Sequence, residues 1–162
     1  MQQKTVPDAG PNVPDVPDML TAAELAALLN TLLEAERAGA KVLSAFLDEY
    51  PRESPAWRQL REVQHDEADN CARLTQAIRD AGGIASHATG EFLDKALAIE
   101  GRVPRLAFLN RGQAWVARKI AAALPRIPPG TTASMLDAMH ASHLANIAAC
   151  DLIIETLDNA RA

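Results

Sequence analysis

The chain has 162 residues, a net charge of −5 and a hydrophobic fraction of 48%, which suits one domain with a sizeable core. A mildly acidic chain lacks the basic surface that nucleic acids and anionic lipids select, so we expect neither as a partner. No apolar run reaches membrane-spanning length, and Cys71 and Cys150 make no disulfide framework. We therefore expect a cytoplasmic protein with two buried thiols, a redox pair being the alternative.

Residues 1–18 are polar and contain four prolines. Such a segment cannot bury an apolar face, so we expect a disordered or loosely docked tail. The folded domain is expected to cover residues 19–162.

The domain is expected to be all-helical, because its apolar residues recur at the spacing of one helix face. Thr21-Ala-Ala-Glu24 is a capping box, and Ser54-Pro55 is a cap followed by a proline at the first helical position. Pro51, paired glycines and the prolines after Leu124 mark helix ends. The sequence predicts helices over about 21–50, 54–82, 102–124 and 132–159, and a short helix over 89–100 capped by Thr89.

The connection lengths predict the topology. Short loops make antiparallel hairpins of the first two and the last two long helices. The segment from Gly82 to Arg102 can span about 50 Å, whereas the next helix is about 33 Å long. It can therefore return along the whole molecule. We predict a ferritin-like four-helix bundle with a long crossover, containing the short helix, between the second and third long helices.

Each long helix carries a polar residue near the middle of its apolar face when residues are placed about 100° apart. These residues are Glu36, Glu67, Gln113 and His143. They are expected to share one layer of the bundle, and buried carboxylates must pair with something. The Glu62-x-x-His65 motif falls outside the apolar face and is read as solvent-exposed.

Three stretches carry a family resemblance. They are Leu33-Glu-Ala-Glu-Arg-Ala-Gly39, Thr89-Gly-Glu-Phe92 and Leu109-Asn-Arg-Gly-Gln-Ala-Trp-Val116. On these, residues 20–158 resemble the ferritin-like superfamily, and within it a group of uncharacterised bacterial ferritin-like domains of unknown function. The resemblance implies the bundle fold more than an activity.

The resemblance also implies where a di-iron enzyme would place its ligands. Glu36 and Glu67 match the first two carboxylate positions. The remaining ligand positions hold Asn70, Gln113, His143 and Asn146. Two carboxylates are too few for a standard di-iron site, so neither an oxygenase nor a ferroxidase activity of that kind is expected.

Three interpretations of the polar layer stay open. In the first, Glu36, Glu67 and His143 hold one iron, manganese or zinc ion, in a mononuclear or degenerate dinuclear metal-dependent oxidoreductase. In the second, the layer is a metal-free hydrogen-bonded network in a binding or assembly protein without a catalytic motif. In the third, it lines a small-molecule pocket. The neighbours expected around it are Gln113, His140, Asn110, Asn70 and Arg111.

A second apolar strip on the third long helix contains Phe108 and Trp115. We expect the crossover, through Phe92 and Leu93, to cover most of this strip. Whatever stays bare is expected to form a homodimer interface.

Overall fold

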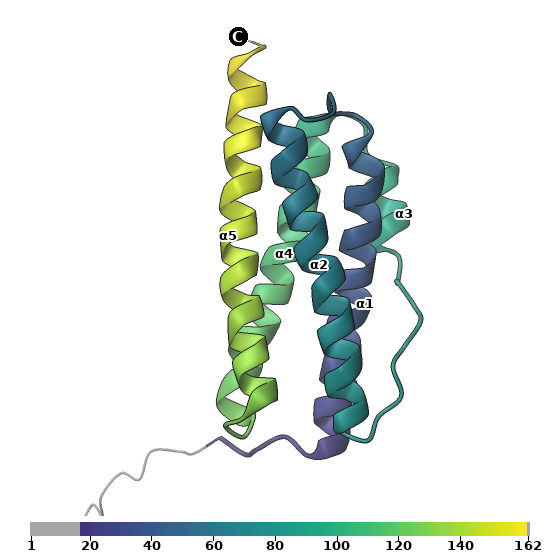
Figure 1. Ribbon diagram of the computed structural model, residues 1–162, viewed down its shortest axis with the longest axis vertical. Coiled ribbons are helices and arrows are strands. Elements are labelled where there is room, and N and C mark those ends of the chain that lie inside the picture. Colours follow the sequence, from purple (N-terminus) through teal and green to yellow (C-terminus); the bar gives the residue numbers. More distant parts are fainter. Residues whose placement is uncertain (1–16, 162) are drawn as a thin grey trace, which may run out of the picture.

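The computed structural model describes residues 17–161, so residues 1–16 of the predicted tail lie outside the described part (Figure 1). The described chain is all-helical, as predicted, and residues 17–161 contain no strand. None of its helices is long and apolar enough to cross a lipid bilayer. The elements are α1 (Ala22–Leu47), α2 (Pro55–Asp80), α3 (Phe92–Leu97), α4 (Arg102–Ala123), a 3₁₀ turn η1 (Leu124–Arg126) and α5 (Thr131–Asn159).

Local chemistry sets the helix starts. The Thr21 side chain accepts from the Glu24 amide and the Glu24 carboxylate accepts from the Thr21 amide, which completes the predicted capping box. Ser54 caps α2 with a proline directly after it. Gly82 adopts φ +77 just after α2, a left-handed conformation that suits glycine and ends the helix. α1 stops at Leu47, before the expected end at Tyr50, because the last residues form turns ahead of Pro51.

The four long helices lie alongside one another (Figure 1). α1 packs mainly against α2, and α4 mainly against α5. After α2 the chain runs back beside α1, so α4 begins near the end of the molecule where α2 also begins (Figure 1). α2 and α4 therefore run in the same direction.

The returning segment, residues 83–91, is fastened to α1 by side chains. The Asn30 amide donates to the Ile84 carbonyl at 2.9 Å, and the Arg37 guanidinium donates to the Ser86 and Ala88 carbonyls at 2.8 and 2.7 Å. The helix predicted over residues 89–100 is therefore shorter than expected, because its first residues belong to this returning segment. Thr89 does not cap it, since a turn with Gly90 at φ +61 follows and only Phe92–Leu97 are helical.

The apolar core consists of two clusters, one toward each end of the long helices. One is built around Leu33, Leu74, Ile120 and Leu136. The other is built around Phe46, Leu60, Leu106 and Ile153. Between them every long helix contributes buried polar side chains, which are Glu36, Glu67, Asn70, Asn110, Gln113, His143 and Asn146.

Candidate functional site

The central polar residues come from four different helices and are all buried. Glu36 on α1, Glu67 on α2, Gln113 on α4 and His143 on α5 each expose 3% or less of their surface. The helical spacing of the sequence places them at the same level, between the two apolar clusters. Because water cannot solvate them there, their partners inside the protein decide what this layer can do.

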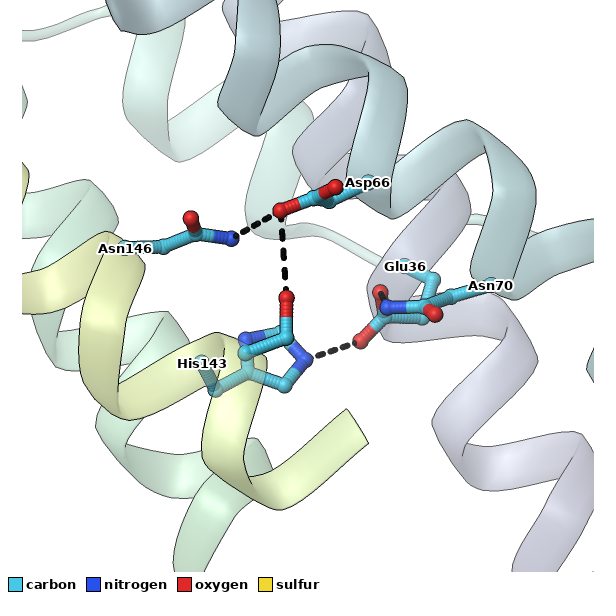
Figure 2. Close-up of polar contacts among 6 residues, drawn as sticks. Glu36, Asp66, Asn70, His143 and Asn146 are labelled. Atoms are coloured by element: carbon cyan, nitrogen blue, oxygen red, sulfur yellow. Dashed lines mark hydrogen bonds and ion pairs between the residues drawn. The ribbon is translucent and has the colours of Figure 1, made fainter. Parts of the chain in front are cut away.

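Glu36 and His143 form the centre of the layer. The Glu36 Oε1 atom lies 2.7 Å from His143 Nε2, and Glu36 Oε2 accepts a 2.9 Å hydrogen bond from the Asn70 side-chain amide (Figure 2). A carboxylate only accepts, so with Glu36 in its ionised form Nε2 of the ring donates the shared hydrogen. Both oxygens of Glu36 are thus occupied, and α1, α2 and α5 are joined through one carboxylate.

A second carboxylate joins α2 to α5 close by. Asp66 Oδ2 accepts from the Ser142 hydroxyl at 3.1 Å and from the Asn146 amide at 3.2 Å (Figure 2). Asn146 is therefore a partner of Asp66. These bonds fix the relative position of α2 and α5, whose contact is smaller than that within either helix pair.

Glu67 is accommodated by a glycine. A Cβ atom built on Gly39 of α1 would lie 1.8 Å from Glu67 Oε2, so the carboxyl fills the space that Gly39 leaves. Glu67 Oε2 has no hydrogen-bond partner among the described residues. Burial, followed by the nearby charges of Glu36 and Asp66, raises the pKa of Glu67 well above its usual value of 4.5. Glu67 therefore favours its neutral form.

Gln113 reaches the layer from α4. Its amide nitrogen donates to Asn110 Oδ1 at 3.2 Å, and the Asn110 amide in turn donates to Asp151 at 2.8 Å and to the Ile147 carbonyl at 3.2 Å. Gln113 Oε1 finds no partner within residues 17–161. The Gln113 side chain is thus oriented by Asn110 with a free acceptor.

A cavity of about 550 Å³ reaches this layer from the surface. Its inner wall contains Glu36, Gly39, Glu67, Gln113 and His143. The apolar sides of the cavity are lined by Ala35, Phe92, Phe108, Leu109, Gly112 and Val116. The mouth lies beside α3 and is lined by the exposed residues Glu91, Lys95, Arg111 and Trp115.

Phe92 forms part of the wall beside α3. Its ring stacks on Phe108 with centroids 4.8 Å apart, and a Cβ on Gly112 would lie 2.7 Å from it. The crossover segment thus covers Phe108, while Trp115 remains 38% exposed.

Two expected neighbours lie away from the polar layer. Arg111 is exposed at the mouth and its guanidinium stacks on the Phe108 ring at 5.3 Å, so it neutralises neither buried carboxyl. His140 is half-buried, with no hydrogen bond to His143 in the described structure. Glu62 and His65 are both exposed.

The donor set does not fit a metal ion as it stands. Within residues 17–161, no group of three or more His, Cys, Asp or Glu side chains is arranged to hold a metal. Glu36 and the Nε2 atom of His143 bond to each other, and Asn70 directs an N–H group at Glu36 where a ligand atom would be needed.

Sequence reasoning missed three residues of the site. Asp66 and Ser142 lie at the edges of their helix faces, and only the pairing of α2 with α5 brings them together. Gly39 could have been found from the sequence. A glycine inside a helix costs about 1 kcal/mol relative to alanine, so its presence indicates that another group packs closely against the helix there.

Comparison with known protein families gives a match over most of the chain. Residues 23–152 match the family described as "Domain of unknown function (DUF6306)", which covers most of the chain. The chain belongs to the DUF6306 family. No curated protein and no solved structure matched it. The polar layer and the mouth residues of this DUF6306 domain all lie within the matched range.

Proposed function

We propose that this DUF6306 protein binds a small molecule in the cavity between α1 and α4, on a ferritin-like four-helix bundle. The bundle assignment is supported by the path of the chain, in which α2 and α4 run in the same direction after the return of residues 83–91 (Figure 1). The binding site is the cavity whose inner wall is the polar layer.

One observation carries the proposal. An apolar cavity of about 550 Å³ ends on three residues whose buried polar atoms lack partners in the described chain: Glu67, Gln113 and His143. Ligand sites combine this size with apolar walls and a few convergent polar groups. An unpaired buried polar atom costs about 1–3 kcal/mol, so three on one wall indicate a partner that enters from outside.

Trp115 gives a direct readout of binding, because it lines the mouth. The sequence has two tryptophans, and Trp57 is outside this cavity, so the Trp57→Phe variant reports on the cavity alone. We expect small aromatic compounds, such as phenethyl alcohol, to change its fluorescence saturably.

A cavity-filling variant gives the matched control. Ala35→Leu adds volume to the cavity wall on α1, whereas Ala27→Leu adds the same side chain at an exposed position of that helix. The first is expected to abolish the saturable change and the second to retain it. A response that survives Ala35→Leu, or no response in any protein, would contradict the proposal.

The metal-dependent alternative makes a different prediction about Glu36, Glu67 and His143. It requires iron, manganese or zinc at about one ion per chain after purification, lost in Glu67→Gln. The cavity proposal expects ligand binding to be unaffected by chelators. Elemental analysis beside the fluorescence titration separates the two.

The cytoplasmic location and the homodimer remain predictions from the sequence. The large apolar residues left exposed on the described chain include Trp115 at the mouth and Leu144 and Leu152 on α5. Light scattering of the purified protein measures whether two chains associate.

A further inference from the structure

The chemistry of the unpaired atoms indicates what kind of ligand end the cavity accepts, provided that the cavity binds a ligand as proposed above. Glu67 Oε2 and Gln113 Oε1 are oxygens without partners in the described structure. His143 Nδ1 is also unpaired there, and it is the acceptor in the tautomer of the ring that carries its hydrogen on Nε2. When Glu67 is ionised, the inner wall therefore offers three acceptors.

The amide nitrogens of the same layer already donate to partners inside the protein. The Asn70 amide donates to Glu36, and the Asn146 amide donates to Asp66. The amide nitrogen of Gln113 donates to Asn110. The unpaired atoms of the layer are thus acceptors once Glu67 is ionised, and a partner that brings N–H or O–H groups would satisfy them.

We propose that the inner end of the cavity binds a primary amine in its ammonium form, attached to a small aromatic or aliphatic body. An ammonium group carries three donors and no acceptor, which matches three unpaired acceptors. Its positive charge also lies beside two carboxyl groups, Glu36 and Glu67. A bound cation favours the ionised form of a carboxyl that burial otherwise keeps protonated.

Other ligand ends suit the site less well. A carboxylate or phosphate would bring only acceptors and a second negative charge next to Glu36 and Glu67. A hydroxyl group, or a water molecule, supplies fewer donors and no charge.

The walls and the mouth are compatible with such a ligand. Phe108, Leu109 and Val116 provide apolar surface for a ring or chain. At the mouth, the Lys95 ammonium pairs with Glu91 at 2.9 Å and the Arg111 guanidinium stacks on Phe108. Both cations are solvent-exposed, where water and salt screen their repulsion of an approaching amine.

A series of three matched compounds tests the proposal. Phenethylamine, phenethyl alcohol and phenylacetate share a phenyl ring on a short chain and differ in the charge and donors of the end group. Titrated against the Trp57→Phe protein, phenethylamine is expected to bind at least about tenfold more tightly than the alcohol, and phenylacetate more weakly than both. Equal or tighter binding of the alcohol or of phenylacetate would overturn the amine assignment.

Glu67→Gln tests which residue provides the preference. The amide has nearly the same size but no negative charge, so amine affinity should fall by about tenfold while alcohol affinity stays within about twofold. The control is Glu62→Gln, at an exposed position on the same helix, which should change neither. An unchanged amine preference in Glu67→Gln would contradict the proposal.

The two proposals fail in different ways. If the alcohol binds as tightly as the amine and Ala35→Leu blocks both, the cavity binds ligands but the amine preference is wrong. If no compound binds the Trp57→Phe protein, or if Ala35→Leu has no effect on binding, the proposed function itself fails.

Discussion

His143 on α5 and Glu36 on α1 are joined by a 2.7 Å contact although 107 positions separate them in the chain. Both side chains are almost completely excluded from solvent, at 2% and 0% exposure. This contact connects the two helix pairs, α1–α2 and α4–α5, through the middle of the molecule.

Removing one member of this pair should destabilise the fold strongly. His143→Ala leaves the buried Glu36 carboxylate with Asn70 alone, and breaking a buried pair typically costs about 3–5 kcal/mol. Urea unfolding measures the loss. The control His65→Ala changes an exposed histidine and should stay within about 0.5 kcal/mol of the parent. A loss under about 1 kcal/mol for His143→Ala would show that the pair adds little stability.

The raised pKa of Glu67 predicts a particular pH dependence. When the pH is above about 4.5, the unfolded chain releases the Glu67 proton while the folded protein keeps it. The free energy of unfolding therefore falls as the pH rises toward the pKa of Glu67 in the folded protein. Glu67→Gln removes this linkage. The melting temperature of the variant should therefore increase relative to that of the parent protein as pH rises from about 5 to about 8.

The matched control for this experiment is Glu62→Gln, whose carboxyl is exposed on the same helix. Its melting temperature should stay parallel to the parent's at every pH. A constant difference between Glu67→Gln and the parent would mean that Glu67 titrates normally in the folded protein.

Gly39→Ala should destabilise the protein although alanine favours helix by about 1 kcal/mol. The added Cβ would lie 1.8 Å from Glu67 Oε2, so the buried Glu67 carboxyl would have to leave the space that it fills beside Gly39. Adding Glu67→Ala removes the clash, so the double variant should be at least about 1 kcal/mol more stable than the sum of the single effects. Additive single effects, measured by urea unfolding, would contradict this packing relationship.

Both thiols should be unreactive in the folded protein. Cys150 is buried as expected, whereas Cys71 is only half-buried. Burial raises the pKa of Cys71 to about 11 and that of Cys150 to about 12, with nearby carboxylates adding to the shift. Thiolate is the reactive form, so a thiol reagent near neutral pH should label them only after denaturation. Rapid labelling of the native protein would favour the redox-pair alternative.

Local signals in the sequence determined what could be predicted. The caps at Thr21 and Ser54 involve residues three positions apart, so short sequence patterns reveal them. The burial of Glu36 and Gln113 follows from helical periodicity, which fixes the face of a residue once the helix is known.

What the sequence could not provide are the partners across helices. The contact of Asp66 with Ser142 depends on how α2 and α5 are placed, and the outward position of Arg111 depends on the ring of Phe108 beside it. The short helix begins later than expected because α1 holds residues 84–88 in an extended path. These outcomes depend on tertiary contacts that no local pattern encodes.

The most direct test of the cavity is to locate a ligand on the folded protein by amide NMR. Phenethylamine or phenethyl alcohol, added to the isotope-labelled chain, is expected to shift the amides of residues 35–39 on α1 and 109–116 on α4, and Ala35→Leu should remove these shifts. Shifts confined to other surfaces, or none at saturating concentrations of either compound, would contradict a ligand site at the polar layer.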